Sequence, residues 1–286
     1  MSEGRIDANG LRFAYLEEGE GPLVLLLHGY PDDANTWSHL LPELAGAGFR
    51  AVAPWTRGYP PTEIPERGFY DPGTLATDAR ELIGSLGGGE PAFVVGHDWG
   101  AATAWYLAAA YPEAVRRAVI LSIPHPAVIA QTFTNPRALQ AVFHWWFFQV
   151  PELPEAALRH NDFAMVEYLW KLWSPGLEDP QHVARIKRMF ETPGAVEASL
   201  AYYRAMFDES LRDPALHEVR AAIGNPVTVP VLSVIGEGEI VRAERGEASG
   251  AFVQALFRFE MIPGAGHFVH RERPAEVAKL VLGWLQ

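Results

Sequence analysis

The sequence predicts an α/β fold, in which a mostly parallel central sheet is flanked by helices and one connection carries a helical insertion. The all-apolar run Pro22–His28 lies between two glycines and is typical of a strand buried on both faces. Similar runs alternate with helix-like stretches, which is the order that builds a covered parallel sheet. The alternation stops at about Pro124 and resumes after Pro226, so we expect the insertion between these points.

The predicted elements can be placed in chain order. Strands are expected at Pro22–His28, Arg50–Pro54, Pro91–Gly96, Val115–Ile123, Val229–Gly236 and Leu256–Ile262. Helices are expected at Thr36–Ala47, Thr74–Leu86, Trp99–Ala110 and, at the end, from about Pro274 to Leu285. Asn35 is placed to cap the first helix, because its side chain can accept a hydrogen bond from the first turn.

The insertion is rich in Trp, Phe, Tyr and Leu at helical spacing and is punctuated by prolines. We therefore divide the chain into a core of residues 1–124 and 226–286 and a helical cap of residues 125–225. In sheets of this kind ligands lie beyond the carboxyl ends of the strands. We expect the cap to cover the sheet there as a lid.

Composition and charge exclude several classes of protein. The 286 residues are 49% apolar, which is enough for a substantial core, and the net charge of −12 argues against nucleic acid and anionic membranes as partners. The chain has no cysteine, which excludes a thiolate nucleophile and cysteine-ligated metals. No apolar run near the start is long enough for a signal peptide or a membrane span. We expect a cytoplasmic protein, monomer or homodimer, that uses no cofactor or metal and binds a small, mainly apolar molecule.

The segment Phe93–Ala102 carries the chemistry. A buried strand runs into Gly96-His97-Asp98-Trp99-Gly100 and then directly into an Ala-rich helix. The nucleophile elbow of α/β hydrolases has this shape, with glycines where the turn leaves no room for side chains. An aspartate has an ordinary pKa of about 3.9 and is ionised without help, so Asp98 is ready to attack an sp³ carbon and form an ester. The alternative is that Asp98 only caps the helix.

Two backbone amides are expected to form an oxyanion hole beside Asp98. The first belongs to Tyr30 in the segment His28-Gly29-Tyr30-Pro31-Asp32, at the end of the first buried run. The second belongs to Trp99, at the start of the helix. Together they can receive the charge that develops on the carbonyl oxygen of an Asp98 ester.

A general base and its orienting acid complete the predicted triad. His267 lies on a Gly-rich loop late in the chain, where the base of this fold belongs, and we favour it over His270, which we expect to face the closing helix or solvent. The acid that holds His267 in the right tautomer is expected to be Glu239, with Glu237 as the alternative. The other position at which enzymes of this fold carry the acid, directly after the strand Val115–Ile123, offers no carboxylate.

These segments together resemble the epoxide hydrolase branch of the α/β-hydrolase superfamily, which is related to the haloalkane and haloacetate dehalogenases. HGYPDDANTW, APWTRGYPPTE, VGHDWGAA, AYYRAM and GAGHFVHRERP stand in that family's order. The resemblance implies two lid side chains that donate protons to the epoxide oxygen as the ring opens. Tyr203, before Arg204, matches one position, and His144, five residues before Gln149, stands where the family usually has the second tyrosine. An imidazole N–H can donate as a phenol does.

The resemblance leaves alternatives. Trp99 also occurs in haloalkane dehalogenases, and the His144-Trp145 pair is similar to a pair in the lid of haloacetate dehalogenases. Those enzymes carry arginines after the nucleophile, whereas residues 99–104 here contain no cation. We expect Trp99 and Trp145 to line the substrate pocket. The leading hypothesis is a hydrolase that opens an epoxide to a vicinal diol; a dehalogenase is second and a non-catalytic ligand-binding homologue third.

Overall fold

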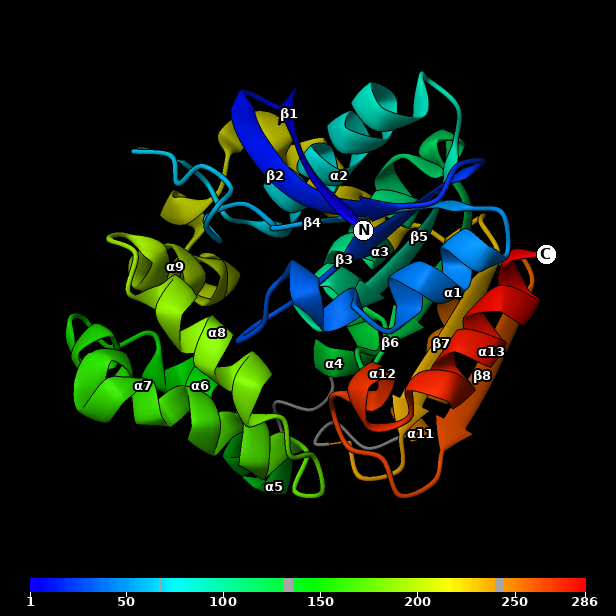
Figure 1. Cartoon of the computed structure of the whole chain (residues 1–286). Helices are drawn as coiled ribbons and strands as arrows, with labels where there is room; N and C mark the ends of the chain where they lie inside the picture. The colour runs from blue at the N-terminus through cyan, green and yellow to red at the C-terminus, as the bar shows by residue number, and fades with distance from the viewer. Residues whose placement is uncertain (67, 131–135, 240–243) are drawn as a thin grey trace.

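The computed structural model describes residues 1–66, 68–130, 136–239 and 244–286, and these contain one eight-stranded sheet. Its order is β1-β2-β4-β3-β5-β6-β7-β8, with β1 and β2 antiparallel to their neighbours and the other strands parallel (Figure 1). The strands are β1 (Ser2–Ala8), β2 (Leu11–Glu18), β3 (Leu23–Leu27), β4 (Arg50–Pro54), β5 (Ala92–His97), β6 (Val115–Leu121), β7 (Val231–Gly236) and β8 (Phe257–Ile262). The predicted mostly parallel sheet is confirmed.

The central strands are apolar on both faces because both faces are covered. Along β3, Val24 and Leu26 pack into one core cluster, whereas Leu25 and Leu27 pack into the other. This alternation follows from the period of two of a strand. All six predicted strands form, within about two residues at each end.

The β1–β2 hairpin was not predicted, although a signal for it is present. Asn9 and Gly10 form its two-residue turn, both with positive φ (45° and 74°). An Asn-Gly pair suits such a turn because both residues tolerate the left-handed region.

Helices cover the two faces of the sheet. They are α1 (Leu40–Gly46) and α13 (Pro274–Leu285), which contact each other, and α2 (Pro72–Gly87) and α3 (Trp99–Ala110), which also contact each other. The first helix begins later than predicted, because residues Ala34–Trp37 form a separate 3₁₀ turn. Asn35 is not the cap: Asp33 is extended there, and its side chain accepts from the Asn35 N–H at 2.8 Å.

The chain between β6 and β7 is helical wherever it forms regular structure in the described residues, which omit 131–135. Figure 1 shows α5–α9 grouped beside one end of the sheet. The helices of this segment are α4 (Pro126–Ala130), α5 (Pro136–Ala141), α6 (Phe143–Phe147), α7 (Leu153–Trp173), α8 (Pro180–Phe190), α9 (Ala195–Phe207) and α10 (His217–Ala221); α11 (Glu244–Ala248) and α12 (Val269–Glu272) follow later in the chain. The division into a core and a cap of residues 125–225 stays a prediction.

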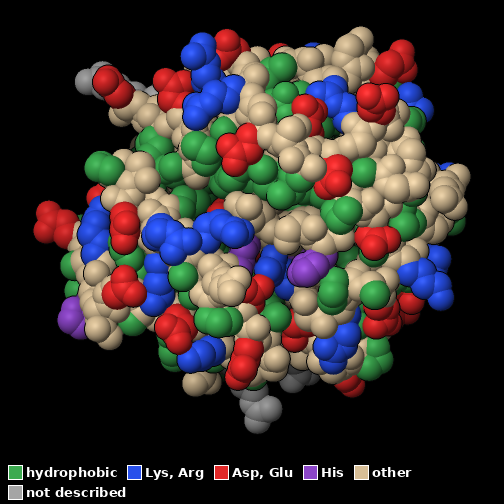
Figure 2. Space-filling model, in the orientation of Figure 1, with side chains coloured by type: hydrophobic (Ala, Val, Ile, Leu, Met, Phe, Trp, Pro, Cys, Tyr) green, Lys and Arg blue, Asp and Glu red, His purple; other side chains and the backbone are tan. Residues whose placement is uncertain are grey.

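This helical segment is anchored to loops that follow the carboxyl ends of β3 and β4. The Trp170 indole N–H donates to the carbonyl of Pro31 at 2.8 Å, and the Tyr202 hydroxyl donates to the carbonyl of Arg57 at 2.6 Å. The segment therefore lies over the edge of the sheet at which β5 delivers Asp98. None of the described helices is both long enough and apolar enough to span a membrane. Acidic and basic side chains are interspersed over the face in Figure 2.

Candidate active site

Asp98 occupies a sharp turn between β5 and α3. Its backbone has φ 52° and ψ −120°, a region that non-glycine residues rarely adopt and that is kept only where the surroundings enforce it. A side chain on Gly96 would overlap the backbone of Gly100, and one on Gly100 would overlap the carbonyl of Leu27. The strand, turn and helix therefore pack so closely that both flanking positions require glycine.

The Asp98 carboxylate is held from two sides. Its Oδ1 accepts the backbone N–H of Tyr30 at 2.7 Å, and its Oδ2 lies 3.6 Å from Nε2 of His267. A side chain on Gly29 would overlap both Asp98 Oδ1 and the nitrogen of Trp99, so these two groups meet at Gly29. Burial opposes the charge, but His267 and the Tyr30 amide outweigh it and hold the pKa of Asp98 below its ordinary value.

His267 joins Asp98 to a second carboxylate. Its Nδ1 lies 2.9 Å from Oε2 of Glu239, whose side chain is completely buried. Burial disfavours the imidazolium, but the charges and hydrogen bonds of Glu239 and Asp98 prevail and raise the pKa of His267 to about 10. Glu237 instead is exposed and accepts the N–H of Gly264 at 3.0 Å. Of the two predicted acids, the structure places Glu239 at His267.

The loop that carries His267 is fixed through its backbone. The carbonyl of His267 accepts from the Ser122 hydroxyl at 2.6 Å and is 2.9 Å from Nε2 of His97, while its N–H donates to the carbonyl of Trp173 at 3.0 Å. His97 is completely buried beneath the elbow. The part played by Ser122 was missed, and no local signal marks it because its partner is 145 residues away.

The prediction for His270 was wrong. Its side chain faces neither the closing helix nor solvent but is buried, 2.7 Å from the Thr36 hydroxyl and beside the rings of Trp37 and His97. The short helix α12 begins at Val269 and turns this residue inward. His270 therefore packs behind the predicted triad.

Among the described residues, two buried groups have the composition of a metal site, namely Asp32 with His97 and His270, and Asp32 with Asp33 and His182. Asp32 belongs to both, and its Oδ1 is already 2.6 Å from Nε2 of His182. Burial opposes this carboxylate, but His182 and Arg271 hold the pKa of Asp32 well below its ordinary value. None of these residues lines the cavity at Asp98. They form a buried polar layer behind the turn.

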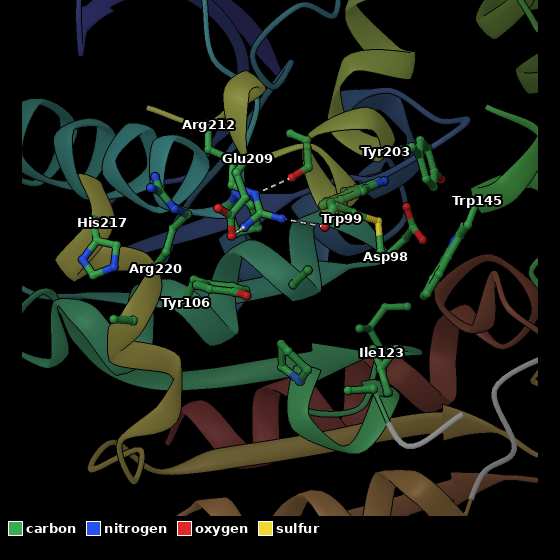
Figure 3. Close-up of a pocket in the computed structure, with 18 of the residues that line it drawn as sticks. Asp98, Trp99, Tyr106, Ile123, Trp145, Tyr203, Glu209, Arg212, His217 and Arg220 are labelled. Atoms are coloured by element: carbon green, nitrogen blue, oxygen red, sulfur yellow. Dashed lines mark hydrogen bonds and ion pairs between the residues drawn. The ribbon is translucent and has the colours of Figure 1, made fainter. Parts of the chain in front are cut away.

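A cavity of about 820 Å³ opens in front of Asp98, a volume suited to a small-molecule ligand. Trp99 lines it from the core, and Trp145 and Tyr203 line it from α6 and α9 (Figure 3). The Tyr203 hydroxyl is buried and has no hydrogen-bond partner among the described residues. Burial raises the pKa of Tyr203 well above its ordinary value, so the phenol keeps its proton.

His144 lies beside Tyr203 but not on the wall of the cavity. The two ring centroids are 5.4 Å apart, and His144 is enclosed by Phe148 and Trp173. Burial lowers the pKa of His144 to about 3, so the imidazole is neutral at neutral pH and carries one N–H. Trp145, the next residue, is the one that reaches the cavity.

Comparison with known proteins shows the family to which this chain belongs. Residues 22–274 match the sequence model of the alpha/beta hydrolase fold family. The chain belongs to the α/β-hydrolase family. The predicted fold class is thereby confirmed for this α/β hydrolase.

Individual relatives narrow the assignment of this α/β hydrolase to a branch. Human Epoxide hydrolase 4 is 32% identical over 99% of this chain and 78% of its own length. The AB hydrolase superfamily protein YfhM of Bacillus subtilis is 32% identical over 98% of this chain and 96% of its own. The solved structure of the epoxide hydrolase CorEH has a TM-score of 0.85 at 25% identity, covering 99% of this chain and 98% of that one. This chain is therefore a hydrolase enzyme of the epoxide hydrolase branch, as the motifs predicted.

Proposed function

We propose that this α/β hydrolase opens an epoxide to a vicinal diol through a covalent ester on Asp98. One observation carries the proposal. A carboxylate stands at the elbow, facing a cavity, with its Oδ1 on a backbone amide and its Oδ2 beside a buried His267–Glu239 pair.

In the first step, Oδ2 of Asp98 attacks a ring carbon, because Oδ1 is held by the Tyr30 amide. A carbon–oxygen bond forms as the ring carbon–oxygen bond breaks, and the epoxide oxygen takes a proton. Tyr203 is the principal donor, since this residue lines the cavity beside Asp98 and its hydroxyl keeps its proton. His144, which the family pattern implies as the second donor, is packed behind Tyr203 and does not line the cavity, so we assign the proton transfer to Tyr203.

In the second step, His267 removes a proton from water, which attacks the ester carbonyl. The negative charge then develops on Oδ1 of Asp98, where the N–H groups of Tyr30 and Trp99 receive it. The tetrahedral intermediate then collapses as its bond to the substrate oxygen breaks. That oxygen takes the proton of the newly added hydroxyl to give the diol, and the carboxylate of Asp98 is restored beside the protonated His267.

Formation of the ester itself prepares the base. The alkylated Asp98 has no charge, so two of the influences that raise the pKa of His267 are lost while burial still lowers it. The pKa of His267 therefore falls, and the imidazole gives up its proton, which balances the proton that Tyr203 takes up again after donating to the epoxide oxygen. His267 is then neutral when water must be activated. Glu239 keeps the Nδ1 proton directed toward itself and leaves Nε2 as the basic nitrogen.

A second candidate, dehalogenation by the same nucleophile, is favoured by one observation: the indoles of Trp99 and Trp145 both line the cavity with Asp98. In that reaction a halide leaves where the epoxide oxygen would, held by indole N–H groups. A third candidate is a ligand-binding homologue with no turnover.

The deciding experiment incubates the protein with aromatic and aliphatic epoxides, haloalkanes and haloacetates and quantifies diol and free halide. Asp98→Ala should abolish product, whereas His267→Gln should accumulate a stoichiometric mass increase on the protein, because alkylation proceeds without the base. Halide without diol would reassign the activity to dehalogenation. No product and no adduct with any compound would contradict a catalytic role for Asp98.

A further inference from the structure

The end of the cavity remote from Tyr203 and Trp145 is charged. Arg212, His217 and Arg220 line it together with Glu209, and Figure 3 shows them at the opposite end of the cavity from Trp145. Tyr106 lies beside Arg220 at this end (Figure 3), and the remaining lining is largely apolar and includes Ala102, Ile129 and Met206.

The length of the cavity can be measured along α3. Trp99, Ala102 and Tyr106 all line it, so one face of this helix runs along the cavity. A helix rises about 1.5 Å per residue, which separates Trp99 from Tyr106 by about 10 Å along the axis. A ligand that touches Asp98 and reaches the charged end is therefore an elongated molecule.

Arg212 carries a charge that no buried carboxylate balances among the described residues. Its Nε and Nη2 donate to the carbonyls of Ala205 and Met206, at 2.7 and 2.8 Å, in the last turn of α9. Both acceptors are uncharged. The carboxylate nearest to Arg212 in the described residues is Glu209, 3.6 Å from Nη1 with its side chain 90% exposed, and the exposed Asp208 also interacts with the Arg212 charge. Such an exposed pair is weak, so Nη1 can exchange it for a ligand.

Arg220 is fixed beside this group. Its Nη1 donates to Oδ1 of Asp71 at 3.0 Å and to the carbonyl of Asp213 at 2.6 Å. Asp71 is completely buried and also caps α2. In the part of the chain that the structure describes, the hydrogen bonds of Arg220 involve Nη1 alone. Burial raises the pKa of Tyr106, and both arginines act against this shift, which places the phenol within the field of both.

The acidic residues nearby do not remove the positive charge from this end of the cavity. Asp71 neutralises Arg220 but lies outside the lining of the cavity, and Glu218, beside the exposed His217, also lies outside it. The lining at this end thus presents two guanidinium groups and one exposed carboxylate, that of Glu209.

We infer that the cavity binds an elongated, apolar epoxide with a carboxylate at its far end, and that Arg212, supported by Arg220, is the group that recognises this carboxylate. The inference rests on the proposed function and refines its substrate class. A guanidinium matches a carboxylate because its N–H groups form a planar fork. Trp99 and Tyr106 lie about 10 Å apart along the axis of α3, so a carboxylate held at the charged end is well separated from Asp98, and the repulsion between the two falls with that separation. Arg212 follows α9 in the chain. Residues 99–104, directly after the nucleophile, contain no cation.

The test compares a straight-chain terminal epoxide that ends in a carboxylate with its primary amide of equal length. The measured quantity is the ratio of kcat/KM for the acid to that for the amide. In the unaltered protein the ratio should be about ten or more, the size of one charge-assisted hydrogen bond, and should fall as salt is added. Arg212→Gln should bring the ratio close to one, and Arg212→Lys should retain part of the preference.

Two exposed carboxylates provide matched variants. Glu209→Gln removes the acid that competes for Arg212 and should raise the ratio, whereas Glu218→Gln, in the same segment but off the cavity, should leave it unchanged. Since Arg212 also holds the end of α9, thermal unfolding is recorded for each variant; if Arg212→Gln does not fold, Glu209→Gln and the salt dependence still decide.

The outcomes separate the two proposals. Diol from the amide and from short neutral epoxides, with no preference for the acid or with a preference that Arg212→Gln leaves intact, would overturn the carboxylate site alone. No diol from any epoxide would overturn the proposed function and with it this inference.

Discussion

Replacing Glu239 by Gln tests the geometry behind Asp98 most directly. The buried carboxylate accepts from Nδ1 of His267 at 2.9 Å, and it is the principal charge that raises the pKa of this imidazole. The substitution keeps the shape of the side chain but removes the charge. It should leave alkylation of Asp98 possible and slow the hydrolysis of the ester.

The size of the effect follows from the lost interaction. A hydrogen bond to a charged group contributes about 1.5–3 kcal/mol, and about 1.4 kcal/mol corresponds to a tenfold change in rate. The hydrolytic step should therefore slow by about tenfold to somewhat over a hundredfold. Rapid mixing with an epoxide should show a burst of adduct on the protein, followed by slow release of diol.

Glu237→Gln is the matched control. Glu237 is exposed and accepts only the N–H of Gly264 among the described residues, so this variant should turn over as the unaltered protein does. If Glu237→Gln slows hydrolysis and Glu239→Gln does not, the assignment of the acid is refuted. If neither variant accumulates adduct, the ester mechanism loses its support.

Three further predictions concern neighbouring groups. Tyr203→Phe should lower kcat/KM for epoxides by about 10²-fold or more, as expected for loss of a general acid, whereas His144→Phe should cost less because His144 lies off the cavity; equal losses in steady-state kinetics would contradict this ranking. Gly29→Ala should displace the Tyr30 amide and lower kcat by about 10²–10³-fold, while circular dichroism should show the fold retained. Folding raises the pKa of His267 from 6.5 to about 10, because Glu239 and Asp98 favour the imidazolium. The protonated His267 therefore stabilises the fold fully below about pH 6.5, and this stabilisation is lost as the pH rises through about 10. The difference in unfolding free energy between the unaltered protein and His267→Gln, measured in denaturant, should shrink across that range and not grow.

The sequence by itself determined the features that depend on local constraints. Strands such as β3 are apolar throughout because both faces are covered, and this pattern can be recognised from the residues of the strand alone. The elbow is equally local, since Gly96 and Gly100 are required by the backbone that packs within a few residues of Asp98 and against β3. The fold class and the position of Asp98 on the turn between β5 and α3 could therefore be predicted.

Tertiary structure decided which side chains meet across long stretches of chain. Glu237 and Glu239 lie two residues apart with the same chemistry, and only the packing of the Gly264–His267 loop puts Glu239 against the imidazole. His270 was misplaced because its partner Thr36 is 234 residues away. Arg212 joins the cavity of Asp98 only because the helical segment folds back over the sheet. Backbone preference acts over a few residues and can be read from the sequence, whereas the partner of a buried polar group is set by contacts that exist only once the chain is packed.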